Sequence, residues 1–331
     1  MRRRQFLYRS LTAAAGIALA AQDAAHSAAL DPVKIVSTSG TTNLVLTALL
    51  RRQGYMQSLG IDPTFINVAD GNKVVAALIS GDVDICPLAG FTQVLAAIAK
   101  GAPLKIIAGG ADKNFNAIFS GNPQVQTLQD LEGHSVGVGA LGTQLHQTMI
   151  ALFRKYGVNS NKVTFANIGA SVDVFKAVQA HIVDAGPAEV WLQGNSGLHI
   201  LEHGKTFESL PEFVNQAAFT SDRAIARKRD VLVRTLAAYA RLYRFVMSGD
   251  SEAAFIAASA SGLGRNDPTF ARAQWDFYRQ IQPFAGNLQL PEDRVRFMQD
   301  LNVNTGTQRE VVAFTKVADM SLARDALKRL A

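Results

Sequence analysis

Short apolar runs alternate with helix-like stretches along the first two thirds of this chain, and the last third is mostly helix-like. This alternation predicts an α/β fold, in which mostly parallel sheets are flanked by helices. The predicted strands are 33–37, 64–68, 83–86, 104–108, 116–120, 134–138, 163–168, 183–185, 198–202 and 215–220. The predicted helices are 44–54, 73–79, 88–100, 145–156, 172–180, 227–247, 252–259, 268–282, 291–301 and 321–330.

Two stretches of the chain, residues 65–87 and 165–187, resemble each other at a fixed offset of 100 residues. Each copy predicts a short strand, a loop, an amphipathic helix and a second strand that ends at a proline. A repeated α/β unit implies two similar lobes with a cleft between them; a chance likeness of two such units is the alternative. The matching pairs are Phe65 and Phe165, Asn67 and Asn167, Val74 and Val174, Ala77 and Ala177, Val83 and Val183, Asp84 and Asp184, and Pro87 and Pro187.

The chain is expected to cross between the lobes at two strand-like segments, 116–120 and 215–220. A length of 331 residues is enough for about two domains. We predict that residues 30–114 and 218–331 form lobe 1 and that residues 115–217 form lobe 2. Two crossings of ordinary length indicate a hinge, which permits closure around a ligand.

The first 29 residues have the pattern of an export signal. Arginines at 2–4 precede an alanine-rich apolar run at 11–21 and the small residues at 27–29. The apolar run is shorter than the ~20 residues that a membrane span needs. Residues 3–7 are also similar to a twin-arginine signal. We predict cleavage after Ala29 and a mature protein in a bacterial periplasm; a retained anchor or helix, and Sec in place of twin-arginine export, are alternatives.

Composition and charge exclude several classes of protein. The chain is 48% hydrophobic and 18% charged, which is typical of a globular protein. Its net charge of +6 is mild, and the arginines near the N-terminus account for much of it, so no nucleic-acid surface is expected. The single cysteine, Cys86, excludes an intramolecular disulfide. Its apolar surroundings predict a buried thiol.

A GxGxxG motif at residues 137–142 stands between a predicted strand and a predicted helix. A dinucleotide site would need an acidic residue at the end of the next strand, 163–168, and none is there. A tight glycine turn that exposes the first N–H groups of a helix to an anion agrees better with these residues. His146 follows one turn into that helix, where it could donate to the anion or, as is more common, face solvent.

A second motif, HxxEH at residues 199–203, has the spacing of an inverted zinc-protease site. That chemistry needs a helix, and Gly197 and Gly204 flank the motif closely. The alternation of polar and apolar residues predicts an exposed strand instead, with Glu202 on the face opposite the two histidines. We therefore predict no metal site.

Ligands of doubly wound sheets bind beyond the carboxyl ends of the strands. The loops expected there are rich in Gly, Ser, Thr and Asn, and four threonines with nearby backbone N–H groups would hold a sulfonate or carboxylate. Phe91 and Trp191 could sandwich an apolar part or pack in the core, and Glu189 could accept from an amine or hydroxyl or face water. The candidate residues are Ser39, Gly40, Thr41, Thr42, Asn43, Asp70, Gly90, Phe91, Thr92, Gly139, Leu141, Gly142, Thr143, Ser171, Pro187, Glu189 and Trp191.

The run VVAALISGDVDI at 74–85, with AKGAPLKI at 99–106, resembles the solute-binding proteins of ABC importers. The branch is the one for nitrate, sulfonates, taurine and thiamine-pyrimidine-like ligands. Residues 128–138 resemble the start of that family's second lobe, and 220–223 resemble the return to the first. The likeness covers most of residues 32–250 and implies a two-lobed, type II-like periplasmic binding protein fold that closes on its ligand and docks to a permease.

Three departures from the family limit what the resemblance says about the ligand. The loop 39–43 lacks an aromatic residue, and His181 stands where a glycine is common. The cysteine-rich segment of the family's enzymes that make a thiamine pyrimidine precursor is absent. We predict a non-enzymatic, monomeric receptor without cofactor that delivers a small organic anion, such as a sulfonate or carboxylate, to an ABC permease in the inner membrane. A ligand sensor for a membrane receptor and a periplasmic enzyme are the alternatives.

Overall fold

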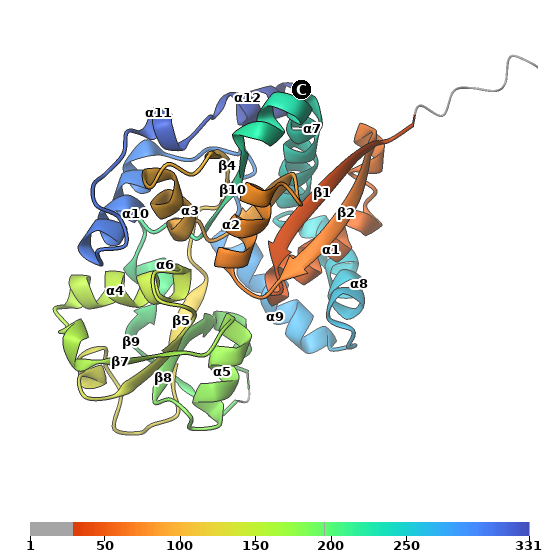
Figure 1. Ribbon diagram of the computed structural model, residues 1–331. Coiled ribbons are helices and arrows are strands. Elements are labelled where there is room, and N and C mark those ends of the chain that lie inside the picture. Colours follow the sequence, from red (N-terminus) through yellow and green to blue (C-terminus); the bar gives the residue numbers. More distant parts are fainter. Residues whose placement is uncertain (1–28, 195, 331) are drawn as a thin grey trace, which may run out of the picture.

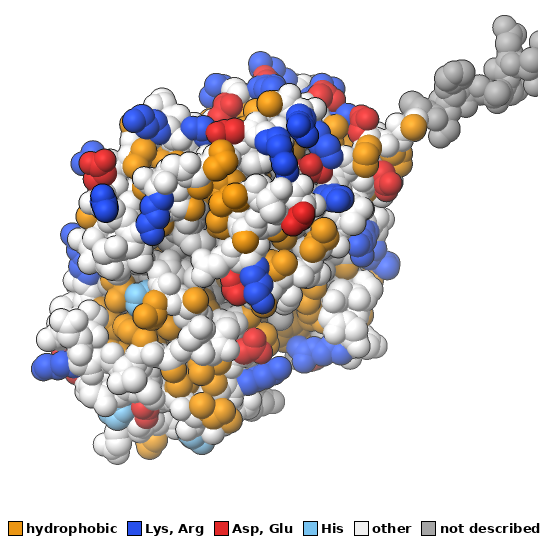
Figure 2. Space-filling model, viewed as in Figure 1, with side chains coloured by type: hydrophobic (Ala, Val, Ile, Leu, Met, Phe, Trp, Pro, Cys, Tyr) orange, Lys and Arg blue, Asp and Glu red, His pale blue; other side chains and the backbone are white. Residues whose placement is uncertain are grey.

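The computed structural model describes residues 29–194 and 196–330, which form two five-stranded sheets with helices around them (Figure 1). The predicted export signal, apart from its last residue, lies outside the described residues and stays a prediction. Within the described part of the chain, no helix is long and apolar enough to span a membrane. On the face shown in Figure 2, Lys and Arg side chains are interspersed with acidic and uncharged residues.

The first sheet has the strand order β2-β1-β3-β10-β4. Strands β2 and β3 both run parallel to β1, and β10 is antiparallel to its neighbours β3 and β4. A strand that returns from the other sheet therefore completes this one. The strands are β1 (Asp31–Thr38), β2 (Ile61–Val68), β3 (Ile85–Ala89), β4 (Leu104–Ala111) and β10 (Gln216–Ser221).

The second sheet repeats this arrangement, with the order β7-β6-β8-β5-β9. Here β6 is parallel to β7 and β8, and β5, which carries the chain out of the first sheet, is antiparallel to β8 and β9. The prediction of two mostly parallel sheets is confirmed, while the limits of the two lobes stay a prediction. The strands are β5 (Asn116–Ser120), β6 (Ser135–Val138), β7 (Thr164–Asn167), β8 (Ala185–Glu189) and β9 (His199–Lys205).

The helices that precede β10 alternate with the strands, and those that follow it gather on the first sheet and along the join between the sheets (Figure 1). The α-helices are α1 (Thr41–Arg52), α2 (Gly71–Ser80), α3 (Thr92–Ala99), α4 (Gln144–Tyr156), α5 (Ser171–Gln179), α6 (Thr206–Ser209), α7 (Asp222–Val246), α8 (Glu252–Leu263), α9 (Pro268–Ile281), α10 (Glu292–Asn304), α11 (Phe314–Val317) and α12 (Ser321–Lys328). Short 3-10 turns are η1 (Gln57–Leu59), η2 (Gln129–Leu131), η3 (Ser160–Lys162), η4 (Val190–Leu192) and η5 (Gly249–Ser251).

The 100-residue repeat is visible in the hydrogen bonds of two equivalent aspartates. The Asp84 carboxylate accepts from the backbone N–H of Lys34 at 2.8 Å, and the Asp184 carboxylate accepts from that of Ser135 at 2.9 Å. In both sheets, a hydroxyl on the antiparallel strand also donates to the backbone oxygen of that aspartate. Each aspartate thus fastens the start of one strand to the turn before the next, so the sequence repeat corresponds to a repeated strand–helix–strand unit.

The predicted helix at 88–100 is wrong at its start. Leu88 and Ala89 continue β3, and α3 begins at Thr92. All five residues of β3 are buried, so the strand has no alternation of polar and apolar residues to mark where it ends. The run of small and apolar residues on both sides of Gly90 is therefore compatible with either structure.

The C-terminal helix α10 packs against both α3 and α4, which belong to different sheets. At its end, the buried Asn302 side chain donates to the backbone oxygen of Thr92 at 2.7 Å and accepts from the Gln147 amide at 3.1 Å. One side chain of the C-terminal region therefore connects the two halves of the molecule.

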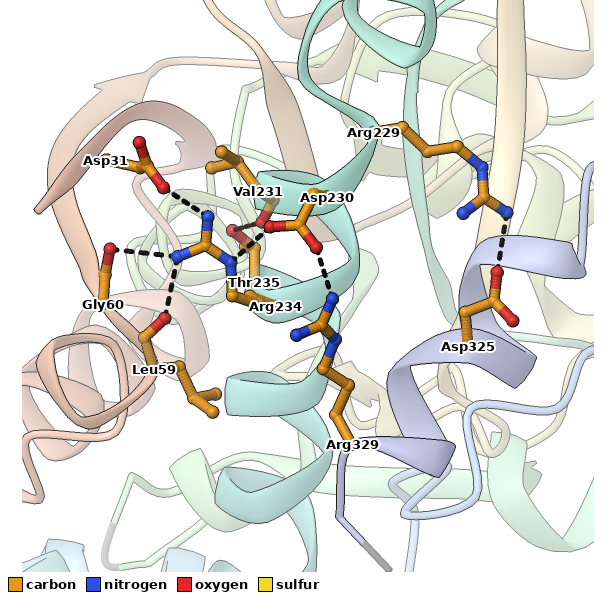
Figure 3. A network of polar contacts seen from close by, with 10 residues as sticks. All are labelled: Asp31, Leu59, Gly60, Arg229, Asp230, Val231, Arg234, Thr235, Asp325 and Arg329. Carbon is orange, nitrogen blue, oxygen red and sulfur yellow. Dashed lines mark hydrogen bonds and ion pairs between the residues drawn. The ribbon is translucent and has the colours of Figure 1, made fainter.

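A network of ion pairs fastens the first strand and the last helix to α7 (Figure 3). Arg234 on α7 pairs with Asp31 at the start of β1 and with Asp230 one turn earlier at 2.8 Å. Arg329, just beyond α12, pairs with the same Asp230. Because the acidic partners are more than half exposed, each pair contributes no more than ~1 kcal/mol.

Candidate functional site

A cavity of about 200 Å³ lies between the carboxyl ends of the strands of the two sheets. Its walls come from the first turns of α1, α2, α3, α4 and α5, and from the two segments that cross between the sheets. Of the predicted site residues, those that line it are Gly40, Thr42, Asn43, Asp70, Gly90, Gly139, Thr143, Ser171 and Glu189. The residues that complete the lining are Thr38, Ala69, Gly71, Gln93, Phe115, Asn116, Ala140, Gln144, Leu145, Asn167, Gly169, Ala170, Asn215 and Gln216.

Four helices have their N-cap residue in the lining of the cavity, and three of them have no side-chain cap. The N-cap residues of α1, α4 and α5 are Gly40, Thr143 and Ala170, and none of them accepts from its helix. The first N–H groups of a helix have no partner within it, so these turns offer backbone donors and the positive ends of three helix dipoles to the cavity. The fourth helix, α2, is capped by the Asp70 carboxylate, which accepts from the backbone N–H groups of Asn72 and Lys73.

The four threonine hydroxyls that were expected to donate to a ligand are bonded within the protein. Thr41, Thr92 and Thr143 donate their protons to protein oxygens, and their role as donors to a ligand stays a prediction. A hydroxyl near the start of a helix can donate to an oxygen in its own loop or to one across the cleft, and the sequence does not show which oxygen is the partner. The partners are the Glu189 carboxyl for Thr41 (3.3 Å), the Tyr278 hydroxyl for Thr42 (2.9 Å), the Gly142 backbone oxygen for Thr92 (3.1 Å) and the Ala140 backbone oxygen for Thr143 (2.6 Å).

The aromatic sandwich that we expected from Phe91 and Trp191 does not form. Phe91 is fully buried in the core, and the ring of Trp191 packs at 5.4 Å from that of Phe115 and at 5.3 Å from that of Tyr278. The alternative, core packing, holds for both residues. The predicted site residues that lie outside the lining are Ser39, Thr41, Phe91, Thr92, Leu141, Gly142, Pro187 and Trp191.

Glu189, the last residue of β8, is the buried carboxyl of the cavity, with 4% of its surface exposed. Its Oε1 accepts from the Thr41 hydroxyl, and its Oε2 has no hydrogen-bond partner among the described residues. Burial raises the pKa of this carboxyl, and the hydroxyls of Ser171 and Thr41 oppose that effect. The two alternatives considered for Glu189 were an acceptor at the ligand and a water-facing side chain, and its burial excludes the second.

The crossing segments contribute polar side chains that sequence reasoning missed. Asn215, just before β10, and Gln216, its first residue, line the cavity, and Gln144 in the first turn of α4 donates to the Asn215 side-chain oxygen. The amide nitrogen of Asn215 and the amide oxygen of Gln216 have no partner in the described part of the chain. The sequence does contain a signal for these residues: two adjacent amide side chains stand at the start of a predicted strand that joins the lobes.

His146 is buried, so the prediction that it faces solvent is wrong. Its Nδ1 accepts from the Gly142 backbone N–H at 3.2 Å, and its ring packs edge-on at 4.7 Å from that of Phe165. Burial lowers the pKa of this imidazole. The backbone N–H of Gly142, the last glycine of the GxGxxG motif, therefore donates to His146 and not to a ligand.

The predicted strand at 198–202 is part of β9, but the Glu202 carboxylate lies 3.7 Å from Nε2 of His203, so these two side chains do not point to opposite faces as predicted. His199 bonds through Nε2 to the Val125 backbone oxygen at 2.8 Å, and the His203 ring stacks on that of Tyr156 at 4.6 Å. Across residues 29–194 and 196–330, no group of three or more His, Cys, Asp or Glu side chains is placed to hold a metal ion.

Comparison with known proteins gives one family and a set of similar structures. The family model described as NMT1/THI5 like matches residues 43–253. The periplasmic aliphatic sulphonate binding protein SsuA from Escherichia coli is 18% identical, with 87% of this chain and 92% of that chain covered and a TM-score of 0.68. The periplasmic nitrate-binding protein NrtA from Synechocystis PCC 6803 is 13% identical, with 91% and 89% covered and a TM-score of 0.74.

The desulfurization enzyme DSZB is also similar, at 16% identity, with 91% of this chain and 100% of that chain covered and a TM-score of 0.60. A comparison with curated protein sequences gives no match. At such identities the structures establish the fold alone. They confirm the two-lobed fold of periplasmic binding proteins that the sequence predicted.

Proposed function

Because the chain belongs to the NMT1/THI5-like family and has this fold, we propose that it is a receptor that holds a small solute by an anionic group in the cleft. The observation that carries the proposal is the meeting of three uncapped helix N-termini at one cavity. Such termini bind oxyanions through unpaired N–H donors and the helix dipole. Helix α1 flanks the first sheet, and α4 and α5 flank the second, so one anion would contact both lobes.

A ligand that contacts both lobes favours the closed arrangement, since its binding energy includes contacts that exist in that arrangement alone. Binding and closure are then linked, as release to a transporter requires. The cavity of about 200 Å³ is smaller than the roughly 300–1,000 Å³ of pockets for drug-sized ligands. A short sulfonate or carboxylate fits this size, and the sulphonate and nitrate receptors with this fold bind solutes of similar chemistry by their names.

The setting of this activity is the periplasm, after removal of the signal near Ala29. The receptor would act as a monomer and deliver its solute to an ABC permease in the inner membrane. A sensor that presents the same solute to a membrane receptor would bind it in the same way. A pull-down with the permease as bait distinguishes the two functions, because the permease would retain a transport receptor and would not retain a sensor.

An enzyme is the less favoured function, although the desulfurization enzyme shares the fold. Among the described residues that line the cavity, the ionisable side chains are those of Asp70 and Glu189. None of these lining residues is Cys, His, Lys or Arg. Asp70 is already occupied as the cap of α2. A single buried carboxyl beside backbone donors suits binding better than bond cleavage, which needs a nucleophile or an acid–base pair.

A thermal-shift screen of residues 30–331 against sulfonates, carboxylates, nitrate and pyrimidines tests the proposed function. A solute present at 100 times its Kd stabilises the folded state by about 2.7 kcal/mol. We expect at least one class to raise the melting temperature in a concentration-dependent manner. If no compound in any class does so, the receptor proposal is wrong.

A further inference from the structure

Glu189 lies where the N-termini of two helices that flank different sheets come together. Its Oε1 accepts from the hydroxyl of Thr41, the first residue of α1, at 3.3 Å. The hydroxyl of Ser171, the first residue of α5, also bonds to this carboxyl. Because the carboxyl is buried and lines the cavity, a negative charge on Glu189 would stand beside the place proposed for the anionic group of the solute.

The cavity has donors for one negative charge and no cation for a second. Its lining, among the described residues, holds no Lys, Arg or His. The other carboxylate of the lining, Asp70, already accepts from two backbone N–H groups at the start of α2. An anionic solute and a charged Glu189 would therefore share the same helix termini, and like charges repel strongly in a buried site. A proton on Glu189 removes that repulsion.

Among the described residues, the elements around Glu189 supply no cation that could take the place of the proton. Strands β5 and β6, on either side of β8, carry no titratable side chain. Tyr278 on α9 is buried, and burial raises its pKa, as does the charge of Glu189. The other titratable side chains of α1, α2, α5, α9 and the last turn of α4 are exposed, except for the half-buried Tyr156: Arg51, Arg52, Lys73, Arg154, Lys155, Tyr156, Asp173, Lys176, Arg272, Asp276 and Arg279.

Two further buried groups, His146 on α4 and Asp112 just after β4, are alternative acceptors for a proton. Neither lines the cavity. His146 accepts from the Gly142 N–H through Nδ1, which requires the neutral imidazole, and burial lowers its pKa. Burial raises the pKa of Asp112 to about 6, against the charges of Arg294 and Lys113. An experiment on proton uptake therefore has to separate these two groups from Glu189.

We propose that the receptor takes up one proton with each anionic solute and that Glu189 holds this proton. The inference rests on the proposed receptor function and names a regulation of its site: a fall in pH tightens binding and a rise in pH weakens it. In the free protein, the Glu189 carboxylate uses the donors of α1 and α5. In the complex, the anionic group of the solute takes over those donors, and a proton from solvent binds the carboxylate, whose Oε2 has no partner among the described residues.

The direction of the pH effect follows from the surroundings of the carboxyl. Burial raises the pKa of Glu189, and the hydroxyls of Ser171 and Thr41 oppose that effect. A bound anion raises this pKa further, because a like charge disfavours the carboxylate. At a pH between the two pKa values, the free protein has lost the proton and the complex keeps it, so the affinity falls by up to about tenfold per pH unit. Below both values, the affinity is constant.

Titration calorimetry of residues 30–331 at pH 6, 7 and 8 tests the proposal. The probes are 1-propanesulfonate, nitrate and any carboxylate of the thermal-shift panel that binds, since their charge is constant in this range. We expect the affinity to fall by about tenfold or more from pH 6 to pH 8. At pH 8, parallel titrations in Tris and triethanolamine, two cationic buffers with different ionisation enthalpies, should show the uptake of about half a proton or more per solute.

Glu189→Gln has nearly the shape of the acid form, carries no charge and keeps an N–H donor. Its affinity should not change with pH, should exceed that of the wild type at pH 8 by about tenfold or more, and should involve no proton uptake. His146→Gln and Asp112→Asn remove the two alternative groups and should keep the uptake. Glu202→Gln makes the same chemical change as Glu189→Gln on an exposed residue of β9 and should match the wild type.

Thermal unfolding verifies that each variant folds. If Glu189→Gln does not fold, infrared difference spectra of Asp112→Asn decide: the carbonyl band of a carboxylic acid should appear when the probe binds at pH 8, and its absence overturns the proposal. An affinity that is constant with pH, or a proton uptake that persists in Glu189→Gln, overturns the role of Glu189 and leaves the receptor function standing. No thermal shift by any anion of the panel at any of the three pH values overturns both.

Discussion

Proline at position 171 offers a direct test of the backbone donors on which the anion site depends. Ser171 is the first residue of α5 and lines the cavity. Proline fits the first position of a helix, where it removes an N–H group that has no partner in the helix. The preceding residue, Ala170, already has φ −73° and ψ 161°, the extended conformation that a following proline requires. The substitution therefore removes one donor and leaves the helix in place.

The matched control is Ser171→Ala, which removes the same hydroxyl and keeps the N–H. A hydrogen bond to a charged group contributes about 1.5–3 kcal/mol, and 1.4 kcal/mol corresponds to a tenfold change in affinity. We therefore expect Ser171→Pro to bind roughly 10- to 100-fold more weakly than Ser171→Ala. Circular dichroism and thermal unfolding of the unliganded variants should be alike.

Titration calorimetry measures both affinities, with the panel compound that gives the largest thermal shift as the ligand. The comparison uses the two variants and not the wild type, so the effect of the lost hydroxyl on Glu189 cancels. Equal affinities of Ser171→Pro and Ser171→Ala would refute the idea that the N-terminus of α5 holds the anion.

Two further predictions concern stability. Asn302→Ala removes the hydrogen bonds to Thr92 and Gln147, so it should lower the free energy of unfolding, measured in urea, by about 2 kcal/mol. The control is Asn304→Ala, an exposed site on the same helix, which should change the free energy of unfolding by less than ~0.5 kcal/mol. Partial burial opposes the shift at Asp184, but hydrogen bonds lower its pKa to about 2 from 3.8, so its stabilisation is complete above pH 3.8 and is lost as the pH falls to about 2. Asp184→Asn should therefore cost about 1–2 kcal/mol at pH 7 and much less at pH 2, where half of the Asp184 carboxyl is already protonated, and an equal loss at both pH values would contradict this account.

The fold was predictable because its signals are local and repeated. Short apolar runs marked the strands, and two aspartates 100 residues apart marked the same turn in each half. The start of α3 was not predictable, since β3 is buried throughout and lacks the alternation that identifies a strand edge. The bridge through Asn302 joins residues more than 150 positions apart in the chain, which no local pattern reveals.

The sequence predicted which loops form the candidate site, but it did not predict which atoms in them are free to bind a ligand. The rule that ligands lie beyond strand ends located Gly40, Thr143 and Ser171 at the cavity wall. Which hydroxyl protons are free depends on the partners that folding supplies, and for Thr143 that partner is its own loop. Asn215 precedes β10 and Gln216 begins it, so neither lies in a loop beyond the end of a parallel strand, where ligand-binding residues are expected.

A crystal structure of residues 30–331 with the solute found in the thermal-shift screen tests the central claim most directly. The account predicts one solute between the two sheets, with an oxygen of its anionic group within hydrogen-bond distance of first-turn N–H groups of helices from both halves, α1 on one side and α4 or α5 on the other. A solute bound on an outer face, or one that contacts a single half and leaves these turns unoccupied, would contradict it.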